Sequence, residues 1–142
     1  MVGVMRTILG ALVFAALAAC ATARAKDVDM SGVWSAVETG PRSRDGGFRA
    51  ELTQDGGGRL SGAGVVDPCP RCAGFMEYDL TWEGGIEGDV LVLTGTPARV
   101  RGRHTVVRFE GRAEGEGFTG VLTGLAGDRA MNVFMQRLPA GE

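Results

Sequence analysis

The chain has 142 residues, of which 15 are basic and 17 acidic, so its formal net charge is −2 at pH 7. A mildly acidic chain with mixed charges argues against general nucleic-acid binding, which normally depends on a net basic surface. The length is sufficient for one domain with a single hydrophobic core. The 24 glycines separate short apolar runs, which favours many short β-strands over long helices.

Residues 1–19 have the features of a secretory signal peptide. Arg6 supplies a positive charge, and residues 8–19 form an uncharged apolar run of 12 residues that ends in small side chains. A helix that crosses a bilayer needs roughly 20 apolar residues. The run is therefore predicted to be the apolar part of a signal peptide and not a permanent membrane span.

The four residues that end this run, Leu17-Ala18-Ala19-Cys20, resemble the lipobox of bacterial lipoproteins. The resemblance implies that Cys20 receives a diacylglyceryl group on its sulfur and becomes the mature N-terminus. Ala21 at the next position implies sorting to the outer membrane, with the protein lipid-anchored on the periplasmic face or the cell surface. The alternative is ordinary cleavage after Ala25, because Ala23-Arg24-Ala25 also has the small-x-small pattern.

Cleavage before Cys20 leaves 142 less the first 19 residues, which is 123. We expect residues 20–30 to be the lipidated N-terminus and a short tether, and residues 31–139 to be a β-barrel domain. The cysteine count agrees with lipidation, because three cysteines leave one unpaired thiol in an oxidising compartment. Modification of Cys20 leaves Cys69 and Cys72 to pair with each other.

Alternating apolar and polar residues predict β-strands along the rest of the chain. In residues 48–54 the apolar side chains share one face, and Met76, Tyr78, Leu80 and Trp82 do so in the next clear segment. With the weaker runs there are eight candidate strands, at about residues 32–38, 48–54, 59–66, 75–83, 89–96, 104–112, 117–124 and 131–138.

An internal repeat supports a meander of these strands. Trp82-Glu83-Gly84 followed by Glu87-Gly88-Asp89 recurs 27 residues later as Phe109-Glu110-Gly111 followed by Glu114-Gly115-Glu116. A repeated strand-turn-strand unit predicts an all-β fold, an eight-stranded antiparallel up-and-down barrel. Closure of the barrel also removes exposed strand edges, which would otherwise pair with other chains.

Seven aromatic side chains are expected to converge on the barrel interior, either as a filled core or as the lining of a ligand cavity. They are Trp34, Phe48, Tyr78, Trp82, Phe109, Phe118 and Phe134.

The motif Gly32-Val33-Trp34 at the first predicted strand resembles the calycin superfamily, the lipocalins and avidins. The resemblance implies an eight-stranded antiparallel barrel that binds small, mostly apolar ligands. It also implies that a basic side chain near the end of the last strand packs across the tryptophan, and Arg137 is the candidate for this barrel-end stack. Such a cation–π contact is worth about 0.5 to 2 kcal/mol. The alternative is a tryptophan that plugs one barrel end without any ligand.

The segment Asp67-Pro68-Cys69-Pro70-Arg71-Cys72 contains a Cys-x-x-Cys pair. No second cysteine pair completes a zinc site, no histidine follows Cys72 as in c-type haem attachment, and no βαβ pattern surrounds the motif. In an oxidising compartment we expect a disulfide that stiffens the loop between the third and fourth strands. A labile redox pair and a metal site remain the alternatives.

Arg99, Arg101 and Arg103 occupy alternate positions, so in an extended segment they share one face. This predicts a candidate anion patch, because guanidinium groups match phosphate and carboxylate oxygens. The alternative is a solvated loop balanced by nearby glutamates. His104 is the only histidine of the chain, and we expect it at the surface.

The sequence offers little support for catalysis. With a single histidine and no glycine-rich phosphate loop, we expect no enzymatic activity, no cofactor and no metal site. The function predicted first is a lipid-anchored, non-enzymatic envelope protein that binds a small apolar ligand in or at the mouth of the barrel. The alternative is a structural, interaction or inhibitor lipoprotein with a filled barrel that acts through surface loops. The expected partners are a membrane, through the lipid anchor, and a small apolar ligand or an envelope protein, without nucleic acid.

Overall fold

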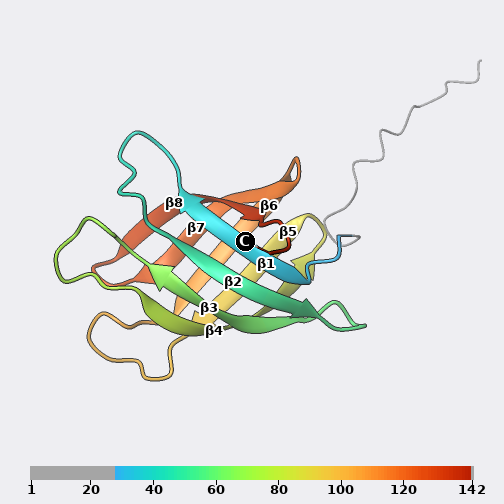
Figure 1. Ribbon diagram of the computed structural model, residues 1–142, viewed down its shortest axis with the longest axis horizontal. Helices are drawn as coiled ribbons and strands as arrows, with labels where there is room; N and C mark the ends of the chain where they lie inside the picture. Colours follow the sequence, from blue (N-terminus) through green and yellow to red (C-terminus); the bar gives the residue numbers. More distant parts are fainter. Residues whose placement is uncertain (1–27, 142) are drawn as a thin grey trace, which may run out of the picture.

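A computed structural model describes residues 28–141, so the predicted signal peptide and Cys20 lie outside the described residues. Eight strands follow one another along the chain (Figure 1). Their bounds are β1 Gly32–Glu38, β2 Gly47–Gln54, β3 Leu60–Asp67, β4 Tyr78–Glu87, β5 Val90–Thr96, β6 Val107–Glu114, β7 Gly117–Leu125 and β8 Arg129–Arg137.

The strands form a closed barrel in which each strand pairs with the next and β8 pairs with β1. Every pairing is antiparallel, and the closing pair sets Trp34 of β1 opposite Arg137 of β8. The predicted eight-stranded antiparallel up-and-down barrel is therefore confirmed. Within residues 28–141, no helix has the length and apolarity needed to cross a bilayer.

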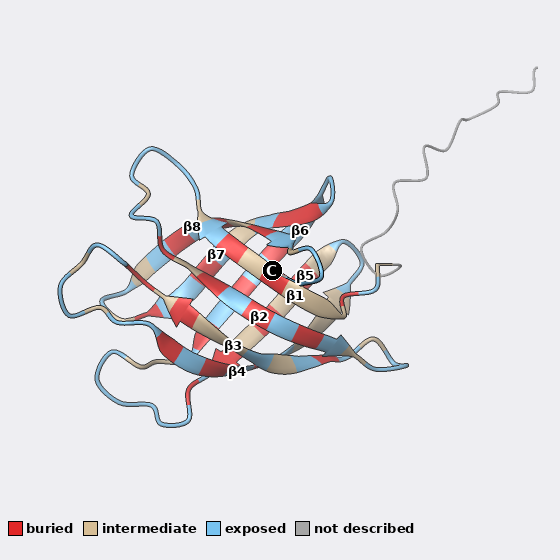
Figure 2. Ribbon diagram, in the orientation of Figure 1, coloured by how far each residue is buried: buried red, intermediate tan, exposed pale blue. Residues whose placement is uncertain are grey.

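Buried and exposed residues alternate along the strands, as a barrel with a dry interior requires (Figure 2). In β2 the buried positions are Phe48, Ala50 and Leu52, as predicted. Six of the seven predicted aromatics lie in the core. They are Trp34, Phe48, Tyr78, Trp82, Phe109 and Phe118.

Aromatic rings pack against one another across the interior. The ring centroid of Phe48 lies 4.7 Å from that of Trp82 and 5.3 Å from that of Phe109. Trp34 meets Phe118 edge to face at 6.0 Å. These are contact distances for aromatic pairs, so the interior around Phe48 is filled by the protein's own side chains.

Glycines inside the strands let the sheet coil tightly enough to close. Gly62 and Gly64 of β3 lie against β2, and a Cβ at either position would overlap the backbone carbonyl oxygen of Glu51 or Arg49. Gly64 also leaves room for the indole nitrogen of Trp82, which donates a hydrogen bond to the carbonyl of Arg49 at 3.3 Å. The glycines are thus more than turn punctuation, because several allow backbones to approach closely.

Two predictions from the alternation were wrong. Phe134 does not point inward, because Met131, Val133 and Met135 occupy the inward positions of β8, and Phe134 lies half-buried on the outer surface beside Gly117. Met76 is 76% exposed because β4 begins only at Tyr78.

The predicted tether is also too long. Met30 is fully buried in the core cluster, and Val28 packs against that cluster. The indole nitrogen of Trp34 donates a hydrogen bond to the carbonyl of Met30 at 2.9 Å. Residues 28–30 therefore belong to the barrel, because they cover its interior near the start of β1.

The two ends of the barrel differ in their connections. Long loops gather at one end, on the left of Figure 1. This loop end comprises residues 39–46, 68–77, 97–106 and 126–128. At the opposite end, the turn end, the described chain begins and the connections are short; it comprises residues 28–31, 55–59, 88–89, 115–116 and 138–141.

The filled core predicts unequal effects for two phenylalanines. We expect Phe48→Ala to lower the free energy of unfolding by about 3 to 5 kcal/mol, because it removes the ring between Trp82 and Phe109. Phe134→Ala, on the outer surface, should lower it by about 1 kcal/mol or less. Urea unfolding followed by tryptophan fluorescence measures both. Equal losses would contradict the placement of these rings.

Candidate functional site

The loop end and the turn end carry opposite charge. Counted over the described residues, the loop end holds six arginines and three acidic residues, a formal charge of +3 with His104 neutral. The turn end holds one arginine and four acidic residues, a formal charge of −3. The arginines of the loop end are Arg42, Arg44, Arg71, Arg99, Arg101 and Arg103.

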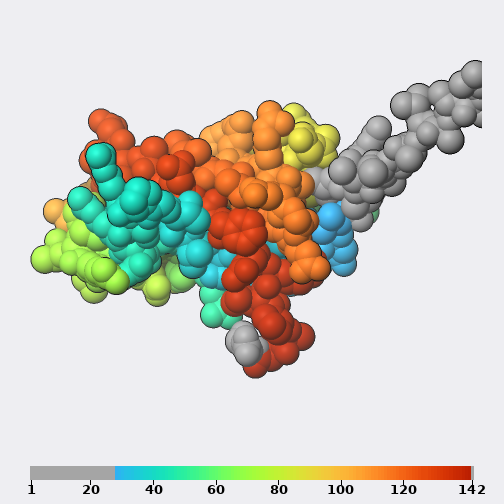
Figure 3. All heavy atoms as spheres, turned by 90° about the horizontal axis from the view of Figure 1, so that it is seen from above, coloured from blue at the N-terminus to red at the C-terminus, as the bar shows by residue number. Residues whose placement is uncertain are grey.

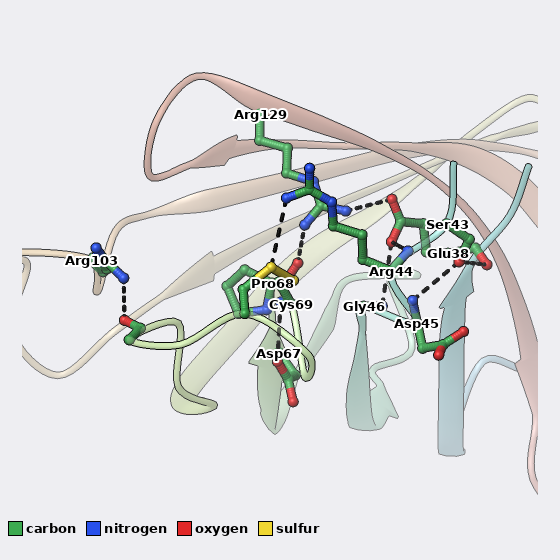
Figure 4. The surroundings of a disulfide bond; sticks show 12 residues. Glu38, Ser43, Arg44, Asp45, Gly46, Asp67, Pro68, Cys69, Arg103 and Arg129 are labelled. Carbon is green, nitrogen blue, oxygen red and sulfur yellow. Dashed lines mark hydrogen bonds and ion pairs between the residues drawn. A yellow bond between two sulfur atoms is a disulfide. The ribbon is translucent and has the colours of Figure 1, made fainter. Parts of the chain in front are cut away.

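A disulfide between Cys69 and Cys72 closes a short ring in the loop between β3 and β4. The backbone N–H of Cys72 donates to the carbonyl of Cys69 at 3.0 Å, and the N–H of Cys69 donates to a carboxylate oxygen of Asp67 at 3.2 Å. Cys69 is buried, and the guanidinium of Arg44 approaches the sulfur of Cys72 at 3.6 Å (Figure 4). The pair thus stiffens this loop and links it to the loop between β1 and β2.

An ion pair joins the first and the last strand of the barrel at its loop end. Arg129 of β8 donates to a carboxylate oxygen of Glu38 of β1 at 2.6 Å and also to the carbonyl of Pro68 (Figure 4). The other oxygen of Glu38 accepts from the backbone N–H of Arg44 at 2.7 Å and of Gly46 at 3.4 Å. One carboxylate therefore fixes two strands and the first loop.

Partial burial by itself raises the pKa of Glu38, but the hydrogen bond from Arg44, the contact with Arg129 and the hydrogen bond from Gly46 outweigh it. The net result is a pKa of Glu38 below its ordinary value. Only 8% of the Glu38 side chain and 23% of the Arg129 side chain are exposed. Glu38 therefore stays charged at neutral pH.

The sequence analysis did not single out this pair, although a signal was present. Glu38 lies two residues after the buried Ala36, and Arg129 lies two residues before the buried Met131, so both occupy inward positions of their strands. A charge at an inward position requires a partner. Its partner lies 91 residues away, which no local pattern discloses.

The predicted stack of Arg137 on Trp34 lies at the turn end. The guanidinium carbon is 4.8 Å from the ring centroid, and the same guanidinium donates to the carbonyl of Asp29. Gly32 has a φ of 127°, and a Cβ there would lie 3.1 Å from a guanidinium nitrogen of Arg137. The glycine of the motif therefore has a physical role, because it leaves space for the stacked arginine.

The three arginines of the predicted anion patch do not act as one face. Arg103 turns away, stacks over Phe75 at 4.1 Å and donates to the carbonyl of Gly74. Arg99 and Arg101 line a pocket of about 330 Å³ together with the start of β4. The predicted patch is thus reduced to two arginines.

His104 is not a free surface residue. Its ring stacks on Tyr78 with centroids 4.6 Å apart and an interplanar angle of 15°. The hydroxyl of Tyr78 donates to the carbonyl of Thr105 at 3.0 Å. The two aromatic rings therefore hold the 97–106 loop against β4, which explains why β6 begins at Val107 and not at the predicted residue 104.

Exposed apolar side chains also gather at the loop end. Met76 is 76% exposed and Val100 is 62% exposed, and Val106 lies in the same loop as Val100. The 39–46 and 68–77 loops lie side by side at one end of the molecule (Figure 3). An ion pair between Asp45 and Arg71 links these two loops.

Three pockets on the surface of the described residues lie at the loop end, a fourth lies at the turn end and a fifth on the barrel wall. None of the five is lined by Trp34, Phe48, Trp82 or Phe109. Among residues 28–141, no group of three histidine, cysteine, aspartate or glutamate side chains is placed to hold a metal ion.

Comparison of the chain with protein-family models, with curated proteins and with solved structures found no match.

Glu38 is expected to make stability depend on pH. Because folding lowers its pKa, its contribution is present above the ordinary glutamate value of about 4.5 and is lost as pH falls through the lower, folded value. We expect Glu38→Gln to lower the free energy of unfolding by about 1 to 3 kcal/mol at pH 7. The difference from the unchanged protein should shrink below pH 4.5.

Urea unfolding measured across this pH range tests the prediction. The control is Glu110→Gln, because Glu110 pairs with Arg108 at the surface with both side chains more than half exposed, and its loss should cost about 0.5 kcal/mol or less. Stability curves of the unchanged protein and Glu38→Gln that stay parallel down to acidic pH would contradict the role of Glu38.

Proposed function

We propose that the protein is a lipid-anchored, non-enzymatic envelope protein that binds a partner through its loop end, with the filled barrel as a rigid support. The observation that carries this proposal is the packing of Phe48 against Trp82 and Phe109. An interior filled in this way supports recognition by the outer surface over a ligand cavity. It favours the interaction function over the apolar-ligand function.

Both mouths of the barrel support the same choice. At the loop end Glu38 and Arg129 form a hydrogen-bonded ion pair in inward positions. At the turn end Arg137 covers Trp34. An apolar ligand that entered by either mouth would have to displace a charged group from its partner. At the loop end this is costly, because the ion pair is largely buried.

The proposed anchor leaves the positively charged loop end free. The described chain begins at the turn end, directly before β1. Residues 21–27 would therefore connect an acylated Cys20 to the negatively charged turn end, and the positive loop end would face away from the bilayer. In that orientation the long loops are free to meet a partner, while acidic residues face the membrane surface.

The side chains at the loop end favour a protein partner with an apolar contact area and acidic residues around it. Met76 and Val100 are the most exposed large apolar side chains among the described residues. Arg42 and Arg99 make no side-chain hydrogen bond or ion pair with another described residue. Methionine and arginine are enriched in protein interfaces.

The anchor is tested by one substitution. We expect Cys20→Ser to move the protein from the membrane fraction to the soluble fraction, because serine cannot accept the thioether-linked diacylglyceryl group. Fractionation of envelopes followed by immunoblotting measures the change. The control is Cys72→Ser in the barrel, which should leave the protein in the membrane. Unchanged membrane association of Cys20→Ser would contradict the lipobox interpretation.

The loop end is tested by native mass spectrometry of the full chain, purified from its own envelope. We expect a bound protein partner, and we expect the double variant Met76→Asp, Val100→Asp to lose it by tenfold or more, since central apolar contacts dominate interfaces. The control Val121→Asp changes a side chain on the barrel wall that is 37% exposed and should keep the partner. A bound small apolar molecule in place of a protein would contradict the proposal.

A further inference from the structure

The 97–106 loop and the start of β4 line an open surface pocket that carries charges of both signs. Its lining includes two arginines, Arg99 and Arg101, and two acidic residues, Glu77 and Asp79. Its volume of about 330 Å³ is at the lower end of the range for small-molecule sites. Opposite charges therefore line the same hollow.

These four side chains do not neutralise one another. No ion pair or side-chain hydrogen bond joins any of them to another described residue. By contrast, Arg129 at the same end of the barrel is fully engaged with Glu38 and Pro68. The pocket thus keeps two positive and two negative groups available to a ligand.

The backbone around the pocket is held in place. Arg101 and His104 exchange two backbone hydrogen bonds of 3.0 Å, which close a tight turn. The His104 ring lies on Tyr78 at 4.6 Å, and the Tyr78 hydroxyl is bonded to Thr105. The arginines are therefore presented by an ordered loop, and the imidazole contributes a flat surface to the lining.

The extended chain at the start of β4 determines the direction of the two acidic side chains. Glu77 and Asp79 flank Tyr78, and since side chains alternate along extended chain, both face out while Tyr78 is buried. An anion that binds to Arg99 and Arg101 would be repelled by these carboxylates, and a cation would be repelled by the arginines. A ligand that carries both charges meets favourable groups on both sides.

We propose that this pocket binds a small zwitterion, a molecule with an ammonium group and a phosphate or carboxylate group a few bonds apart. The anionic group binds to Arg99 and Arg101, the ammonium group binds to Glu77 and Asp79, and the carbon chain between them lies along the His104 ring. This inference rests on the proposed function, because it assigns a ligand to the same loop end. All four charges are exposed, so the expected Kd is roughly millimolar.

His104 makes the test direct. It is the only histidine of the chain, so its imidazole carbon-bound protons give a unique NMR signal from the pocket lining. The full chain in non-ionic detergent is titrated with phosphoethanolamine and, separately, with glycylglycine. We expect a saturable shift of the His104 signal with at least one of them, and the tighter of the two distinguishes a phosphate ligand from a carboxylate ligand.

Ligands with a charge of only one sign provide the comparison with the zwitterions. Inorganic phosphate, acetate and ethanolamine should each bind at least about tenfold more weakly than the better zwitterion, because each meets one repelling pair. No saturable shift with either zwitterion would overturn the proposal. Phosphate or acetate that bound as tightly as the zwitterion would also overturn it and would leave a simple anion site.

Variants assign the roles of the two sides. Arg99→Gln and Arg101→Gln should each weaken zwitterion binding by about tenfold or more, whereas Arg59→Gln, at the turn end, should leave it unchanged. The double variant Glu77→Gln, Asp79→Asn should strengthen phosphate binding and abolish the preference for the zwitterion. Unchanged selectivity in that variant would contradict the assignment of the ammonium group.

The outcomes separate this inference from the proposed function. The His104 titration reports on the pocket whether or not the protein has a protein partner. Conversely, native mass spectrometry detects a protein partner of the unchanged protein by its mass, so that result does not depend on zwitterion binding. Each proposal can thus fail while the other holds.

Discussion

The constraint on which the structure depends is the width of an eight-stranded barrel, whose interior is just large enough to be filled by side chains or to hold one small ligand. Here Phe48 contacts both Trp82 and Phe109 in that interior. Strand glycines allow the strands to approach closely enough for these contacts. A filled interior favours the proposal that recognition takes place on the outer surface.

The same strand closes both ends of the interior. Arg129 begins β8 and Arg137 ends it, and the buried side chains of Met131, Val133 and Met135 lie between them. Arg129 binds Glu38 at the loop end, and Arg137 lies over Trp34 at the turn end. The inward positions of β8 thus carry an arginine at each end and apolar side chains between them. The barrel separates a basic loop end from an acidic turn end.

Much of the fold could be predicted from the sequence, because it depends on local pattern. Alternation and the repeated strand-turn-strand unit give the strand count, the antiparallel order and most inward residues. The two wrong predictions have physical reasons. Met131, Val133 and Met135 fill the inward positions of β8, so Phe134 lies outside. Met76 precedes the first residue of β4.

The candidate site was less predictable, because it depends on contacts between distant segments. The Cys-x-x-Cys spacing indicated the disulfide, and the alternate arginines indicated charge in the 97–106 loop. The pairing of Glu38 with Arg129 requires the closed barrel. The stacking of His104 on Tyr78 and the approach of Glu77 and Asp79 to Arg99 require the 97–106 loop to fold back against the start of β4. Where each loop folds back is decided by tertiary packing and not by its own sequence.

The central claim, that the protein's own side chains fill the barrel, is tested most directly by a crystal structure of the protein under xenon pressure, because xenon enters apolar cavities that stay dry. The account predicts no ordered xenon atom in the space enclosed by Trp34, Phe48, Trp82 and Phe109. Xenon bound among these rings would contradict it and would show an interior able to hold an apolar ligand.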